Sequence, residues 1–128
     1  MATGFPFSTG DVLSAAAMNG LVAFSTTTKT ADYELASTDQ YQMLVIANKA
    51  TAINITIPTD ATYNFPVGTA ITVLNIGVGA ATIKATTSGT TTVNSAGATA
   101  AQPSVAQYKS AACIKTAANT WYVVGAIA

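Results

Sequence analysis

Five carboxylates are the natural candidates for acid–base chemistry in this chain, and they are Asp11, Asp32, Glu34, Asp39 and Asp60. A glycosidase would need two of them on either side of a sugar, one to donate a proton and one to attack or activate water. Asp32 and Glu34 share one face of a predicted strand, but adjacent acids on an exposed strand are normally solvated. Asp39 and Asp60 fall in predicted turns, where aspartate commonly bonds its own backbone. The carboxylates therefore predict no active site.

Other catalytic and metal-binding arrangements lack an essential residue type. The chain has no His and no Arg, and Cys113 is its single cysteine. A Ser-His-Asp or Cys-His arrangement is therefore impossible, and a zinc site would need a cluster of His or Cys ligands. A lone cysteine of this kind most often behaves as a small buried hydrophobe. We expect no enzymatic activity, no cofactor and no metal site.

Two further motifs have a structural explanation as well as a chemical one. The segment Gly77-Val78-Gly79 lacks the lysine and helix of a phosphate-binding loop, so it predicts a hairpin turn. Alternation along a strand would place one of Trp121 and Tyr122 in the core and the other on the surface. A predicted loop at 59–68 carries Tyr63 and Phe65, which we take as the candidate surface-binding loop.

The charge content is low for a chain of this size. Asp, Glu, Lys and Arg make up 8% of 128 residues, against about 25% in typical domains, and the formal net charge is zero. Nucleic-acid binding needs a clustered basic face, and a membrane-spanning helix needs about 20 apolar residues, so we expect neither nucleic-acid nor membrane partners. Uncharged polar residues could solvate such a surface, or it could be buried against copies of itself or a partner.

Hydrophobic residues follow a period of two from residue 32 onward, which is typical of strands. Residues 53–57 alternate apolar and polar side chains, so they predict a half-buried strand, whereas residues 42–48 predict a strand buried on both faces. Residues 69–75 and 81–85 predict a hairpin, and residues 105–115 predict one long strand.

The complete pattern predicts an all-β fold, an antiparallel sandwich or barrel of about eight short strands. No spacing suits a helical crossover, which argues against a parallel sheet, and the chain shows no strict internal repeat, which argues against a solenoid. We divide the chain into an N-terminal arm at 1–24 and a β-sandwich or barrel domain at 25–128.

The arm contains one predicted short helix, near residues 14–19, and a proline-stiffened apolar start. It would either pack on its own domain or dock on a neighbouring protein, because its large apolar side chains would otherwise be exposed. The candidate docking residues are Phe5, Phe7, Val12, Leu13, Met18 and Leu21.

Several stretches resemble structural proteins of tailed bacteriophage virions. Residues 7–19, FSTGDVLSAAAMN, resemble an N-terminal segment found in many of these proteins. Residues 52–58, 65–71 and 119–125 resemble the strand and turn pattern of β-domains in phage head and tail appendages. The resemblance covers most of the chain and implies a homotrimer, but its motifs do not separate head decoration from a tail fibre.

The leading hypothesis is a capsid decoration, or cement, protein on the outer surface of the virion. It would bind the major capsid protein or a neighbouring virion protein through the arm, while the β-domain associates with itself. The alternative is a short fibre or receptor-binding knob that recognises a host surface glycan through Tyr63 and Phe65.

Overall fold

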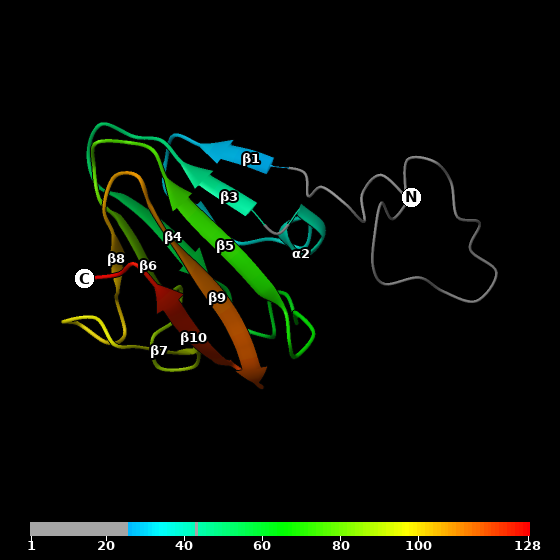
Figure 1. Ribbon diagram of the computed structural model, residues 1–128. Coiled ribbons are helices and arrows are strands. Elements are labelled where there is room, and N and C mark those ends of the chain that lie inside the picture. Colours follow the sequence, from blue (N-terminus) through cyan, green and yellow to red (C-terminus); the bar gives the residue numbers. More distant parts are fainter. Residues whose placement is uncertain (1–25, 43) are drawn as a thin grey trace, which may run out of the picture.

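The computed structural model describes residues 26–42 and 44–128, which form two β-sheets packed face to face (Figure 1). Sheet A contains, in spatial order, β1 (Thr26–Lys29), β3 (Leu44–Ala47), β5 (Ala70–Asn75), β9 (Lys109–Ala117), β10 (Thr120–Gly125) and β7 (Thr92–Ser95). Sheet B contains β2 (Tyr33–Glu34), β4 (Ile53–Ile57), β6 (Ala81–Ala85) and β8 (Ser104–Val105). One helical turn, α2 (Asp39–Gln42), precedes β3. The all-β prediction is confirmed for the described residues, and the predicted arm and its helix lie outside them.

In the first six strands the chain changes sheet after every strand, so β1 and β2, β3 and β4, and β5 and β6 form a stack of three β-arches. Strands β1, β3 and β5 lie side by side in sheet A, and β2, β4 and β6 do the same in sheet B. All of these neighbours are parallel, as is the pair β10 and β7. The prediction of an antiparallel arrangement is therefore wrong for five of the eight strand pairings.

The predicted hairpin between residues 69–75 and 81–85 is also wrong, because β5 and β6 belong to different sheets. The turn between them stacks on the preceding arch turn, where the Gly79 amide donates to the Lys49 carbonyl oxygen at 3.0 Å. A Cβ atom at Gly79 would lie 1.8 Å from the carbonyl oxygen of Thr51, and one at Gly77 would lie 2.3 Å from the Lys49 nitrogen. These glycines permit the close approach of two arch turns rather than a hairpin reversal.

The C-terminal strands complete the sandwich with antiparallel pairings. The predicted long strand at 105–115 is divided into β8 and β9, which lie in different sheets, and Tyr108 in the turn between them has a φ of 63°. A tight turn with a φ of 49° at Asn119 joins β9 to β10. Strand β9 thereby covers the exposed edge of β5, and β8 covers part of the edge of β6.

The core lies between the two sheets and is filled by alternating side chains from both. Ile53, Ile55 and Ile57 are fully buried, and the residues between them are half-buried, which confirms the half-buried prediction for β4. Strand β3 also alternates, so the prediction that it is buried on both faces is wrong. Trp121 is buried and Tyr122 is exposed, which confirms that one of the pair lies in the core and the other on the surface, and Cys113 is fully buried.

Candidate functional site

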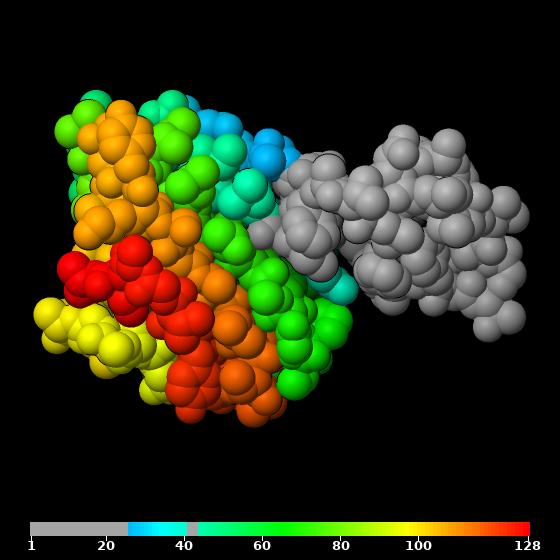
Figure 2. Space-filling view, viewed as in Figure 1, coloured from blue at the N-terminus to red at the C-terminus, as the bar shows by residue number. Residues whose placement is uncertain are grey.

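The outer face of sheet A is the candidate functional surface, because its described residues carry no charged side chain. The strand register places alternate residues of β1, β3, β5, β9, β10 and β7 on this face, opposite the buried ones. The large apolar residues there are Leu44, Ile46, Leu74, Ile114, Tyr122 and Val124. The smaller and polar ones are Thr26, Thr28, Ala70, Thr72, Thr92, Asn94, Ser110, Ala112 and Thr116. Figure 2 shows this side of the molecule.

The lysines of sheet A occupy positions that point toward the other side of the sheet. Lys29 and Lys109 share one cross-strand row with buried Ala47 and Asn75, at the end of the sheet. Lys115 lies in the core with 1% of its surface exposed. The alternation of the sequence thus removes every lysine of these strands from the outer face.

The outer face of sheet B has the opposite character. Glu34, Thr56 and Lys84 lie in one cross-strand row, and Asn54 is opposite Thr82 in another. Asp32 beside this face accepts hydrogen bonds from the backbone and side chain of Asn54, at 2.9 and 3.3 Å. These bonds, together with the nearby lysines, hold the pKa of Asp32 below its usual value of 3.8. This face is polar and charged, as is typical of a surface in contact with water.

An apolar groove of about 420 Å³ adjoins the outer face of sheet A where β10 meets β7. It is lined by Asn94, Ser95, Ala96, Tyr122, Val123, Val124, Gly125 and Ile127. Tyr122 and Val124 are 45% and 50% exposed, so two of the larger apolar groups of the face border the groove.

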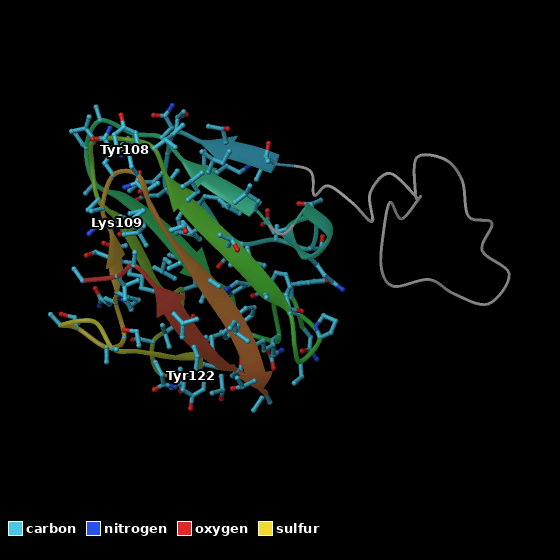
Figure 3. All side chains as sticks on the ribbon, viewed as in Figure 1. Tyr108, Lys109 and Tyr122 are labelled. Atoms are coloured by element: carbon cyan, nitrogen blue, oxygen red, sulfur yellow. The ribbon has the colours of Figure 1, made fainter. Side chains whose placement is uncertain are left out.

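A second exposed apolar cluster, which we name the tip, lies where β5 and β9 adjoin their turns. It consists of Ile76, Val78 and Tyr108, which are 37%, 73% and 77% exposed. Buried Asn75 fixes both turns, because its side chain donates to the carbonyl oxygens of Gly79 and Val105 and accepts from the Gly77 amide. Figure 3 shows Tyr108 and Lys109 at one end of the sheet and Tyr122 far from them.

In the predicted surface-binding loop, Phe65 points into the core and is only 1% exposed. Its ring packs edge-on against Trp121, with ring centroids 5.5 Å apart. The loop is held down by the Lys115 ammonium, which donates to Asp60, to Asn64 and to the Phe65 carbonyl oxygen at 2.7 to 2.8 Å. Tyr63 is half-buried and its hydroxyl bonds Gln40. Phe65 is therefore a core residue and not a surface contact.

The described carboxylates have structural partners. Asp39 is buried and accepts from the Ala36 amide and the Tyr33 hydroxyl, both at 2.7 Å, and burial together with this carboxylate raises the pKa of Tyr33 to about 12. The Asp60 carboxylate accepts hydrogen bonds from the Lys115 ammonium and from the backbone N–H of Asn119. The prediction that Asp60 bonds the backbone of its own turn is therefore wrong. Burial raises the pKa of the Cys113 thiol to about 12, which keeps it protonated and unreactive at neutral pH.

Within residues 26–42 and 44–128, no three His, Cys, Asp or Glu side chains gather in a way that could hold a metal ion. The same part of the chain has no helix that is long and apolar enough to cross a membrane. The candidate docking residues Phe5, Phe7, Val12, Leu13, Met18 and Leu21 lie outside it.

Comparison with known proteins gave no match, whether to family models, to curated proteins or to solved structures. The function must therefore be inferred from the surfaces described above. The outer face of sheet A was missed in the sequence because residues 42–48 were expected to be buried on both sides. Its signal was the absence of Lys, Asp and Glu at alternate positions of six strands.

Proposed function

We propose that this chain is a non-enzymatic structural protein that works as part of an assembly. The observation that carries the proposal is the uncharged outer face of sheet A, set against the charged outer face of sheet B. Isolated soluble domains normally distribute charges over all of their faces. An apolar sheet face with half-buried Leu and Ile side chains is instead typical of a surface that another protein covers.

The assembly that we propose is a bacteriophage virion, with the protein as a capsid decoration, or cement, protein on the outer surface of the shell. The support is the resemblance of residues 7–19, 52–58, 65–71 and 119–125 to virion structural proteins. In this proposal the arm at 1–24 binds the major capsid protein, and the β-domain associates with copies of itself and bridges neighbouring capsid subunits. The stabilisation comes from buried apolar surface and needs no cofactor.

The proposal is tested by binding of the purified full chain to capsids that lack it. We expect saturable binding at hundreds of copies per particle and a higher temperature of capsid disruption. Deletion of residues 1–21 should abolish the binding while leaving the β-domain folded. Full-affinity binding by the truncated chain would exclude the arm as the docking segment, and no binding by the full chain would exclude the decoration role.

A second candidate function, a receptor-binding knob, is favoured by the tip. Tyr108 is the most exposed large hydrophobic residue described, and its positive φ is unusual for a residue other than glycine. Binding residues are often carried by loops that a rigid scaffold positions, and Tyr108 is an exposed aromatic side chain in such a place. Binding to a host glycan in the absence of capsids, lost in Tyr108→Ala and retained in Tyr122→Ala, would support the knob. Equal binding by the Tyr108→Ala protein would exclude the tip as the contact.

A further inference from the structure

We propose that the outer face of sheet A is the surface through which copies of this chain bind one another. The inference rests on the proposed assembly function and names the surface and its occupant. Three properties of the face support a second copy of the chain as that occupant: its charge, its size and its relief.

The first property is the complete lack of charge among the described residues of the face. When two identical faces meet, a charged group on one face can lie opposite a group of the same charge on the other, and like charges brought together in an interface repel one another. The outer face of sheet B would instead place the charged Glu34 and Lys84 side chains in the contact, where each would have to lose its contact with water. The outer face of sheet A contains no such group, so it can pack on itself without repulsion.

The absence of charge also argues against an unrelated partner protein. Interfaces between different proteins commonly use complementary charges to steer encounter and to exclude wrong partners. Charged residues occur elsewhere on the described surface, including Asp32, Glu34 and Lys84 near the outer face of sheet B. Their absence from the outer face of sheet A leaves it without a means to select an oppositely charged partner.

The second property is size. Six strands at about 4.8 Å spacing make the face about 24 Å wide, and six-residue strands such as β5 and β10 are about 20 Å long. The flat area is therefore about 500 Å², and the side-chain relief and the adjoining groove enlarge it. A standard protein–protein interface buries about 800 Å² per partner, so the face is of the right order for a stable contact between two copies.

The third property is relief. Cross-strand rows on the face mix large and small side chains, for example Thr28, Ile46, Leu74 and Ser110 along one row. Such rows interdigitate when sheets pack face to face at about 10 Å. Tyr122 and Val124 stand at the border of the groove, where an aromatic anchor of one copy can enter the hollow of the other.

The test measures the molar mass of the full chain by light scattering after size-exclusion chromatography across a range of concentrations. We expect an oligomer for the native sequence and at least a hundred-fold weaker self-association for Val124→Lys, a substitution that the fold should tolerate because Val124 is 50% exposed. Leu74→Lys, at the centre of the face, should have the same effect. The matched control Thr82→Lys adds the same charge to the outer face of sheet B and should leave the molar mass unchanged.

A monomeric native chain at all concentrations would overturn the inference, as would a Val124→Lys protein that stays oligomeric. Circular dichroism melting of each variant separates loss of association from loss of folding. The two proposals fail separately. Capsid binding by a chain that is monomeric in solution would retain the decoration role and remove this interface. A native chain that is oligomeric, that dissociates in the Val124→Lys variant and that never binds capsids would retain this interface and exclude the decoration role.

Discussion

The two outer faces of the sandwich are built from similar alternating strands around one shared core, yet their chemistry differs. On the inner side both sheets contribute Ile, Val and Ala, and their burial is alike. On the outer side sheet B bears Glu34, Thr56 and Lys84, whereas sheet A bears Leu, Ile, Thr and Tyr. The inner positions therefore determine the fold, and the outer positions determine which face can remain in water.

The comparison also shows where this chain places its few charges. Lys115 forms its bonds beneath sheet A, while Asp32 bonds Asn54 beside the outer face of sheet B. The described charges of the strands thus lie away from the outer face of sheet A. Substitutions that act on one sheet, or on both, can test whether the two faces are independent.

The largest loss of stability is expected from a substitution in the turn that connects β5 of sheet A to β6 of sheet B. Gly79→Ala places a Cβ atom 1.8 Å from the Thr51 carbonyl oxygen, which forces the stacked arch turns apart and affects strands of both sheets. We expect a loss of about 3 kcal/mol or more in the free energy of unfolding. Urea denaturation measures it. Gly89→Ala is the matched control, because nothing lies within 4 Å of its added Cβ, and it should leave stability unchanged or slightly higher. Equal stability of the two variants would contradict the arch-stacking argument.

A smaller loss is expected from a change beneath sheet A alone. Lys115→Met keeps the length of the side chain but leaves the acceptors on Asp60, Asn64 and Phe65 without their donor. Since the Asp60 side chain is 18% exposed and water can replace part of the bonding, we expect a loss of about 2 to 3 kcal/mol. The control is Lys84→Met on the outer face of sheet B, which should change stability by less than about 0.5 kcal/mol. A similar loss in both variants would show that the position of the lysine does not matter.

Alkaline pH should lower the free energy of unfolding through one buried group in each sheet, and by a different amount for each group. Burial raises the pKa of Cys113, in β9 of sheet A, from 9.0 to about 12, and that of Tyr33, in β2 of sheet B, from 10.0 to about 12. Because each folded-state pKa is raised, the stabilisation is present at lower pH and is lost as pH rises above the unfolded value. We expect a loss of about 1 to 2 kcal/mol between pH 8 and pH 10, mainly from Cys113, because its pKa in the unfolded chain is the lower of the two. Cys113→Ala should abolish most of this slope, and Tyr33→Phe should preserve most of it, in urea titrations at each pH.

The smallest effect concerns Asp32 beside the outer face of sheet B. Its pKa is lowered first by the backbone hydrogen bond from Asn54 and then by the side-chain bond, so its contribution is present above pH 3.8 and is lost as pH falls. NMR titration of the carboxyl carbon should give a midpoint below 3.8. Asn54→Ala removes only the side-chain bond and should move the midpoint part of the way back. A midpoint at or above 3.8 in the native chain would contradict the hydrogen-bonded arrangement.

Local pattern predicted much of the fold but not the pairing of its strands. The period of two identified β4 with its correct ends and its inward residues, and it divided Trp121 and Tyr122 between core and surface without saying which is buried. The same period is compatible with parallel or antiparallel neighbours, because it encodes which side a residue faces and not which strand lies beside it. The turn at 77–79 was therefore interpreted as a hairpin, although its glycines serve the contact with the previous arch.

The site was less predictable because it depends on residues far apart in the sequence. Phe65 lies in the core because Lys115, 50 residues later, binds its carbonyl oxygen and closes the loop. The outer face of sheet A combines strands from residues 26 to 125, and only the strand order brings their uncharged positions together. The tip depends on Asn75, which joins two turns through bonds to Gly79 and Val105.

The register between the second and third arches defines a structural unit that could be repeated along the chain. From the second arch to the third, each residue pairs with one 28 positions further along the chain, from 44 to 72 in sheet A and from 53 to 81 in sheet B. A tandem duplication of that length would add one parallel strand to each sheet while leaving the distance between the sheets unchanged. Each added unit would widen both outer faces by about 4.8 Å. Gene duplication could therefore enlarge the contact area of such a protein in fixed steps, with no redesign of its core.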